Sequence, residues 1–157
     1  MALRGLTVLA VVPARGGSKS IPHKNLAHVG GISLVGRAGD LAAGLDWVDR
    51  AIISTDDEEI AAEAVKYGLD APFMRPEELA GDKSTSNDMW RHAWLAAEDY
   101  YGIRFDVSIL LEPTSPLRRA EDVKLTVQTL VDSGHKAAAT LSPTQTHFAP
   151  QKTLQLD

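Results

Sequence analysis

Short apolar runs alternate along the chain with segments whose apolar residues recur at helical spacing. The run Thr7–Val12 is almost continuously apolar, which is typical of a strand buried on both faces. The segment Leu34–Leu45 instead places an apolar residue every three or four positions, and this spacing predicts a helix. The same alternation predicts further strands at 50–55, 71–74, 107–111 and 137–141, and further helices at 56–67, 85–101 and 120–133.

Two of these helices carry end signals in the sequence. Thr55 with Glu58, and Thr85 with Asp88, have the spacing of a capping box, in which two side chains satisfy free amides at a helix start. Gly68 is placed to end the first of the two helices, because glycine readily adopts the left-handed conformation found there. The helix boundaries are therefore predicted near these residues.

Strands separated by crossover helices predict an α/β fold. We expect a Rossmann-like three-layer sandwich, with a mostly parallel sheet and helices on both faces. No internal repeat, low-complexity tract or linker interrupts the pattern, so one domain over residues 1–157 is expected. Ligands of open parallel sheets bind beyond the carboxyl ends of the strands. The candidate binding loops are therefore 13–25, 54–57, 75–87 and 112–119.

Composition narrows the classes of function. The 16 basic and 21 acidic residues leave a net charge of −5, which argues against binding along nucleic acid. The chain has no cysteine, which excludes disulfides, thiolate metal sites and cysteine nucleophiles and fits a cytoplasmic location. No stretch approaches the roughly 20 apolar residues that a membrane span needs, so no membrane partner is expected. The five histidines show no metal-ligand spacing.

The loop 13–25 holds the most distinctive chemistry. It contains two adjacent glycines, several hydroxyl side chains and the cations Arg15, Lys19 and Lys24. Glycines let the backbone approach a ligand and turn amides toward it, and cations hold phosphate oxygens. A solvated turn is the alternative, but three cations directly after a buried strand favour a triphosphate site. Neither the Walker A nor the dinucleotide glycine pattern occurs in the chain, so the loop is of another type.

A resemblance to a known family begins in this loop. The residues Ala14-Arg15-Gly16-Gly17-Ser18-Lys19, followed by Pro22-x-Lys24-Asn25, resemble the signature of the acylneuraminate cytidylyltransferases. These are the CMP-sialic acid synthetases and their relatives that act on legionaminic, pseudaminic and similar nine-carbon acids. Three further segments agree in order and spacing, and the match covers nearly the whole chain: Ser54–Asp57, Arg75–Ala80 and Pro113–Arg118.

The resemblance implies a fold, a reaction and a set of site residues. It implies the nucleotide-diphospho-sugar transferase fold and an enzyme that transfers CMP from CTP to the anomeric hydroxyl of a nine-carbon α-keto acid sugar. Pyrophosphate leaves, and Mg²⁺ is the implied cofactor. Arg15 and Lys24 would be catalytic, because they would hold the phosphates and stabilise the charge that develops on pyrophosphate. The implied nucleotide-binding residues are Ala14, Gly16, Gly17, Ser18, Lys19, Asn25, Arg75, Ser84 and Ser86. The implied sugar-binding residues are Glu112, Thr114 and Ser115.

Several of these residues have an ordinary structural interpretation. Arg75 could be a surface arginine at a strand end, and the turn 84–87 could serve only as a helix cap. Asp57 is expected to be structural, because acidic residues complement a helix start, whereas the role of Asp56 stays open. His147 lies where the family places part of its sugar site, which is a weak signal.

The chain departs from the family pattern at Glu112, where the family has glutamine. Glutamine both donates and accepts hydrogen bonds, whereas an ionised glutamate only accepts. Glu112 could accept from a sugar hydroxyl or amino group and would repel a nearby carboxylate. We therefore hypothesise a sugar specificity that differs from that for sialic acid itself.

A second departure concerns the metal. Family members continue past this point, and their later part supplies an Asp-x-Asp pair for Mg²⁺ and an arm that builds a homodimer. No Asp-x-Asp occurs in this chain. We expect a single nucleotide-binding domain that lacks the metal-binding and dimerisation part, with no metal ligand of its own.

Two alternatives to this function stay open. One is another sugar nucleotidyltransferase, such as the enzyme for the eight-carbon acid Kdo, although that enzyme carries a different glycine loop. The other is a remnant that binds a nucleotide but does not catalyse a reaction.

Overall fold

The computed structural model describes residues 3, 5–18, 21–81 and 84–141. The chain divides into two compact units, Met1–Ala120 and Glu121–Asp157, and each is described by itself. The strands among the described residues and the candidate site belong to the first unit. A single domain over residues 1–157 remains a prediction.

A three-stranded parallel sheet forms the centre of the first unit. The strands are β1 (Val8–Pro13), β4 (Arg50–Ser54) and β5 (Val107–Leu110), in the spatial order β4-β1-β5. The register pairs Pro13 with Ser54 on one side of β1 and Val8 with Val107 on the other. The predicted buried first strand is therefore confirmed as the central strand.

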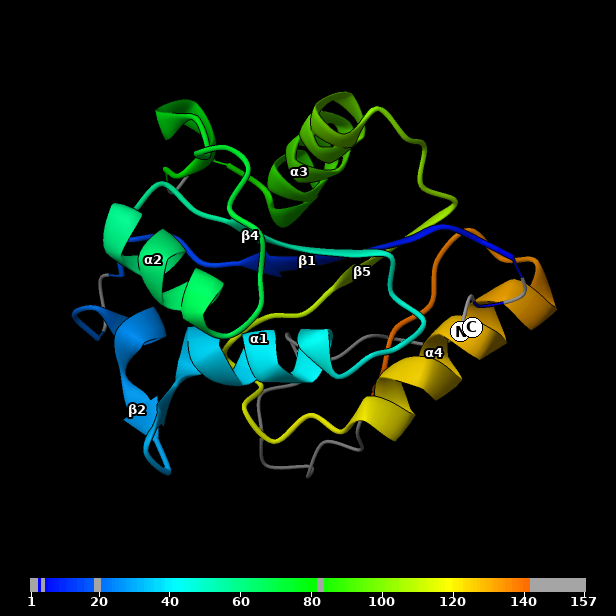
Figure 1. The fold of residues 1–157 in the computed structure, drawn as a ribbon, viewed down its shortest axis with the longest axis horizontal. Helices are drawn as coiled ribbons and strands as arrows, with labels where there is room; N and C mark the ends of the chain where they lie inside the picture. Colours follow the sequence, from blue (N-terminus) through cyan, green and yellow to red (C-terminus); the bar gives the residue numbers. More distant parts are fainter. Residues whose placement is uncertain (1–2, 4, 19–20, 82–83, 142–157) are drawn as a thin grey trace, which may run out of the picture. The chain divides into compact units, whose positions relative to one another are not determined.

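Helices cover both faces of this sheet (Figure 1). The helix α3 (Ser86–Tyr101) packs on one face, where its buried alanines join Leu9 and Val11 of β1 in one apolar cluster. The helix α1 (Leu34–Ala43) packs against β1 and β4 on the opposite face, and α2 (Glu58–Lys66) packs against α1. The predicted layered α/β fold is confirmed.

A small hairpin that the sequence analysis missed precedes α1. It pairs β2 (His28–Val29) with β3 (Ile32–Ser33), and the 3-10 helix η1 (Lys24–Leu26) leads into it. Gly30 and Gly31 form the two-residue turn with φ angles of 60° and 83°. Turns of this kind need positive φ at both central residues, which suits a pair of glycines.

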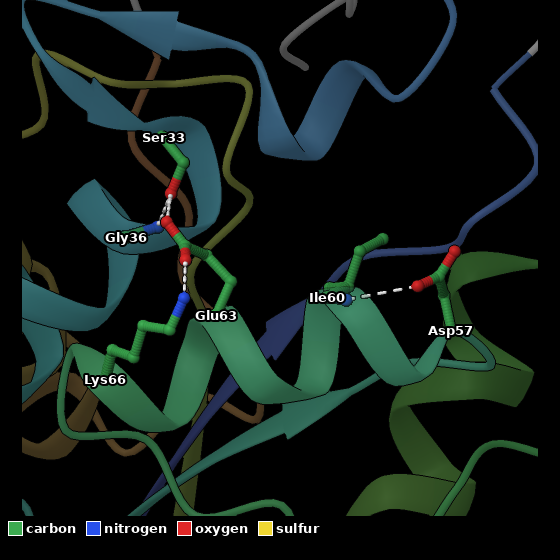
Figure 2. Close-up of polar contacts among 6 residues, drawn as sticks. All are labelled: Ser33, Gly36, Asp57, Ile60, Glu63 and Lys66. Carbon is green, nitrogen blue, oxygen red and sulfur yellow. Dashed lines mark hydrogen bonds and ion pairs between the residues drawn. The ribbon is translucent and has the colours of Figure 1, made fainter.

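A polar cluster joins α1 to α2 (Figure 2). The Ser33 hydroxyl accepts a hydrogen bond from the Gly36 amide at 3.0 Å and so caps α1. The same hydroxyl donates to Glu63 Oε1 at 2.8 Å, and Lys66 pairs with Glu63 Oε2 at 3.0 Å. Because of these hydrogen bonds, and of the Lys66 charge, the pKa of Glu63 lies below its usual value. One buried serine thus connects the two helices.

One of the two predicted capping boxes is wrong. The N-cap of α2 is Asp57, and Thr55 instead accepts a hydrogen bond from the Asp57 amide at 3.1 Å, so the Thr55–Glu58 pair does not form. The N-cap of α2 therefore lies two residues later than the Thr55–Glu58 spacing indicated. The second box, Thr85 with Asp88 at the start of α3, is confirmed.

Two predicted strands are absent from the residues that the structure describes. The segment 71–74 forms no strand, and the single bridge to β4, between Asp70 and Ile52, lies just before it. Pro72 lacks an amide hydrogen and cannot extend the ladder. The predicted strand 137–141 is also wrong, because these residues are exposed and irregular. The predicted helix α4 (Ala120–Ser133) is confirmed, and η2 (Glu77–Leu79) follows the bridge segment.

Candidate nucleotide site

A cavity of about 390 Å³ lies where the loops after β1 and β5 meet the segment that leads into α3. It lies beyond the carboxyl ends of the parallel strands, as the sequence analysis predicted from the fold class. Three segments supply its lining: Pro13, Arg15, Ser18, Lys24, Asn25, Arg75, Leu79, Ala80, Gly81, Ser84, Thr85, Ser86, Met89, Glu112, Pro113 and Thr114.

The loop after β1 is closed on itself by Asn25. This side chain is only 6% exposed, and its Nδ2 donates a hydrogen bond to the Arg15 carbonyl at 3.0 Å. Asn25 follows Lys24 in η1, so the bond brings the two ends of the loop together. As a result, the cations Arg15 and Lys24 both line the same cavity.

Arg75 is a buried arginine, so its interpretation as a surface residue is wrong. It is 7% exposed, its Nε donates to Ser54 Oγ at 3.1 Å, and its Nη2 donates to the Ser54 carbonyl. Burial lowers the pKa of the Arg75 guanidinium, the negative charge of Asp56 opposes this, and Arg15 adds to the lowering. Two hydrogen bonds therefore hold the side chain rigidly against the end of β4, where it lines the cavity.

The start of α3 combines capping with lining of the cavity. Thr85 accepts a hydrogen bond from the Asp88 amide at 3.1 Å, so the structural interpretation of this turn is correct for Thr85. Ser84 and Ser86 flank the cap, and both line the cavity. The turn therefore serves as a helix cap and also places hydroxyl groups at the candidate site.

The loop after β5 places Glu112 and Thr114 on the cavity wall. Arg118 reaches back and donates a hydrogen bond from Nη1 to the Glu112 carbonyl at 3.3 Å. The Ser115 amide donates to the same carbonyl at 3.2 Å. Burial lowers the pKa of Arg118, and the Glu112 carboxylate opposes that effect. The backbone of Glu112 is thus anchored within its own loop.

Some expected site residues do not line this cavity. Four are described by the structure yet are not among the lining residues: Ala14, Gly16, Gly17 and Ser115. Lys19 and His147 lie outside the described residues. The sequence analysis gave no role at the site to several residues that do line it: Pro13, Leu79, Ala80, Gly81, Thr85, Met89 and Pro113. Most of them lie in, or next to, the segments quoted for the family resemblance. Their closeness to these motifs is the signal that could have identified them from the sequence.

Two kinds of feature are missing from the part of the chain that the structure describes. No three histidine, aspartate or glutamate side chains gather there as a metal ion would require. No helix in the described segments is long and apolar enough to cross a membrane.

The chain has an α/β fold of the open parallel-sheet type, with a cation-lined cavity beyond the carboxyl ends of its strands. A family model described as cytidylyltransferase matches residues 9–151. The chain therefore belongs to the cytidylyltransferase family, and the resemblance stated from its motifs is confirmed.

Curated relatives agree with this family. The CMP-N,N'-diacetyllegionaminic acid synthase of Legionella pneumophila is 34% identical over 142 residues, which cover 88% of this chain and 59% of the relative. The post-translational flagellin modification protein B of Campylobacter coli is 32% identical over 136 residues, which cover 87% and 58%. The chain thus spans less than two thirds of the length of these relatives.

Solved structures agree in fold. The CMP:2-keto-3-deoxy-manno-octonic acid synthetase complexed with CTP superposes with a TM-score of 0.64 at 24% identity, over 82% of this chain and 48% of that one. A cytidylyltransferase from Leptospira borgpetersenii gives a TM-score of 0.61 at 21% identity, over 81% and 50%. The expected nucleotide-diphospho-sugar transferase type of fold is therefore confirmed.

Proposed function

We propose that this chain binds CTP in the cavity and that the whole protein transfers CMP to a nine-carbon α-keto acid sugar. The observation that carries the proposal is the convergence of Arg15, Lys24 and Arg75 on one cavity beyond the sheet. Membership of the cytidylyltransferase family supports the nucleotide, and the names of the relatives support the sugar class. A triphosphate needs several cations and hydroxyl donors, and this lining supplies them.

In the proposed reaction the anomeric hydroxyl of the sugar attacks the α-phosphorus of CTP. A bond forms between the sugar oxygen and that phosphorus, the bond to the β-phosphate oxygen breaks, and pyrophosphate leaves. The hydroxyl proton is released. Catalysis of such displacements depends mainly on positioning and on charge stabilisation. Arg15 and Lys24 would oppose the charge that develops on pyrophosphate. Mg²⁺, which proteins hold with one or two carboxylates together with substrate phosphates, would bind along with CTP.

The other lining residues receive roles from their positions. Ser18, Asn25, Ser84 and Ser86 would contact the nucleotide, and Glu112 with Thr114 would contact the sugar. The expected site residues that do not line the cavity, among them Gly17, would support the cavity wall without touching the nucleotide or the sugar.

The proposal extends to the setting of the whole protein. We infer a homodimer that acts in the cytoplasm, with neither nucleic acid nor a membrane as a partner. The family resemblance supports the dimer, and the net charge of −5 and the absence of cysteine support the rest.

Calorimetric titration with CTP, ATP, GTP and UTP tests nucleotide binding by this chain. We expect preference for CTP, and we expect Lys24→Met to weaken CTP binding by about tenfold or more, the usual effect of losing a charged hydrogen bond. Lys124→Met, which removes the same charge from an exposed position on α4, is the matched control and should bind as the parent does. Equal affinity for the four nucleotides, or equal loss in both variants, would contradict the proposal.

Pyrophosphate release by the whole protein tests catalysis. Incubation with CTP, Mg²⁺ and a panel of α-keto acid sugars should show turnover with nine-carbon acids. Turnover with Kdo alone would favour the eight-carbon alternative, and binding without turnover would favour the remnant. Glu112→Gln should shift the preference among the nine-carbon acids, and an unchanged preference would refute a role of Glu112 in specificity.

A further inference from the structure

Two neighbouring aspartates that follow β4 bind different partners. Asp57 Oδ1 accepts hydrogen bonds from the amides of Glu59 and Ile60, at 2.9 and 3.1 Å, and so caps α2; Figure 2 shows the bond to Ile60. Asp56 Oδ1 accepts from the Gly16 amide at 2.9 Å, across to the loop after β1. Asp57 is thus committed to its own helix, whereas Asp56 contacts the loop that lines the cavity.

The bond from Gly16 to Asp56 continues the pairing of β1 with β4 beyond the sheet. The last paired residues are Pro13 and Ser54, and the Ala14 amide donates to the Ser54 carbonyl at 3.0 Å. In a parallel ladder the next amide in turn is that of Gly16, and its acceptor would be the carbonyl of residue 56. The Asp56 side chain takes the place of that carbonyl. The ladder of hydrogen bonds between the two segments therefore extends one bond beyond the ends of β1 and β4.

The loop and the aspartates are in close contact at this point. A Cβ on Gly16 would lie 2.7 Å from Asp57 Oδ2, closer than real Cβ contacts come, and 3.0 Å from Asp57 Cβ, which is also tight. The next residue back from Gly16 is Arg15, which lines the cavity. The position of the Gly16 amide therefore constrains where the Arg15 backbone lies.

Asp56 also acts on the opposite wall of the cavity. Arg75 is buried against Ser54, and burial alone disfavours its charged form. The carboxylate of Asp56 opposes this and favours the charged guanidinium, so it raises the pKa of Arg75 against the effect of burial. One exposed carboxylate thus supports two cations of the site without lining the cavity itself.

We propose that Asp56 is a positioning residue for the nucleotide, whose carboxylate holds the loop of Arg15 in place through the Gly16 amide. This role rests on the proposed binding of CTP. It predicts an effect opposite to that of simple electrostatics. Removing a negative charge near an anion site should tighten binding, whereas removing a positioning contact should weaken it.

Three variants of the 157-residue chain separate these effects. Asp56→Ala removes both the charge and the acceptor, Asp56→Asn keeps an acceptor oxygen, and Asp57→Asn removes the same charge one residue away while keeping a good helix cap. Each is titrated with CTP and with inorganic tripolyphosphate at one ionic strength. Amide hydrogen exchange of Gly16 is measured by NMR without nucleotide. Thermal unfolding shows that each variant is folded.

We expect Asp56→Ala to weaken CTP binding by about three- to tenfold, the range of one hydrogen bond, and to speed exchange of the Gly16 amide. Asp56→Asn should recover most of the affinity, and Asp57→Asn should bind as tightly as the parent or more tightly. Unchanged or tighter binding by Asp56→Ala, or an equal loss in Asp57→Asn, would overturn the role. If the parent chain does not bind CTP, the proposed function fails, and the Gly16 exchange rate in Asp56→Ala still decides whether Asp56 holds the loop.

Discussion

Gly16 has no space for a side chain, so Gly16→Ala tests how tightly the cavity wall is packed. An added Cβ would stand 2.7 Å from Asp57 Oδ2 and 3.0 Å from Asp57 Cβ. Asp57 cannot swing aside freely, because its other carboxylate oxygen caps α2 through the amides of Glu59 and Ile60. The added methyl group must therefore either strain the contact or open the cap.

Both outcomes have known costs. Overpacking a tight contact costs about 1–3 kcal/mol, and loss of an N-cap costs about 0.5–2 kcal/mol. The two are alternatives, because opening the cap relieves the strain, so they do not add. We expect Gly16→Ala to lower the free energy of unfolding by about 1–3 kcal/mol. In a chain of this length, each kcal/mol corresponds to a fall in Tm of about 2–4 °C.

Gly17→Ala is the matched control, since among the described residues no atom beyond its own chain neighbours lies within 4 Å of a Cβ at that position. Its stability should stay within about 0.5 kcal/mol of the parent, as for most exposed substitutions. Urea unfolding followed by tryptophan fluorescence measures both variants. If Gly16→Ala and Gly17→Ala unfold at the same urea concentration, the tight contact between the loop and Asp57 does not exist in solution.

Three further predictions follow from the described contacts. His23 has a φ of 49°, so His23→Gly should raise the urea midpoint by the equivalent of about 0.5–1 kcal/mol, and an unchanged or lower midpoint would argue against strain there. Ser33→Ala removes the cap of α1 and its hydrogen bond to α2, so calorimetric unfolding should show a loss of about 1–2 kcal/mol, larger than any loss on Ser33→Thr. Burial first, and then the charge of Arg75, lowers the pKa of His92, although Glu78 opposes this. Stability should therefore fall as the pH drops below about 6.5, where the unfolded chain takes up the proton. His92→Gln should flatten that part of the pH profile, and an identical slope in both proteins would rule out His92 as its source.

Most of the helices and strands could be located from local patterns. A recognisable pattern of apolar residues needs several consecutive positions. The strands β1, β4 and β5 and the helices α1 to α4 are long enough to show one. The hairpin of β2 and β3 could not be located in this way, because strands of two residues carry no period. The predicted strand 71–74 failed for a different reason, since Pro72 cannot donate to a ladder and only Asp70 pairs with β4.

The candidate site was predicted in part. The rule that ligands bind beyond the carboxyl ends of parallel strands selected four loops, of which 13–25, 75–87 and 112–119 line the cavity and 54–57 does not. Arg15, Lys24 and Arg75 line this one cavity. The apolar part of the wall, such as Leu79 and Met89, could not be assigned, because an apolar residue in a loop or helix looks the same whether it faces a core or a cavity.

The amino-acid sequence by itself indicated most of the strands and helices, the family, and the cations of the loop after β1. Only the tertiary structure decided which polar groups meet. Asp56 and Asp57 are chemically identical neighbours, yet one binds the Gly16 amide and the other caps α2. Arg75 is likewise buried because Ser54, 21 residues earlier in the chain, accepts both of its hydrogen bonds. The Gly16–Asp56 pair depends on the register between β1 and β4, and the Arg75–Ser54 pair depends on how the chain returns to the end of β4. A local pattern contains no information on which residues of distant segments become neighbours.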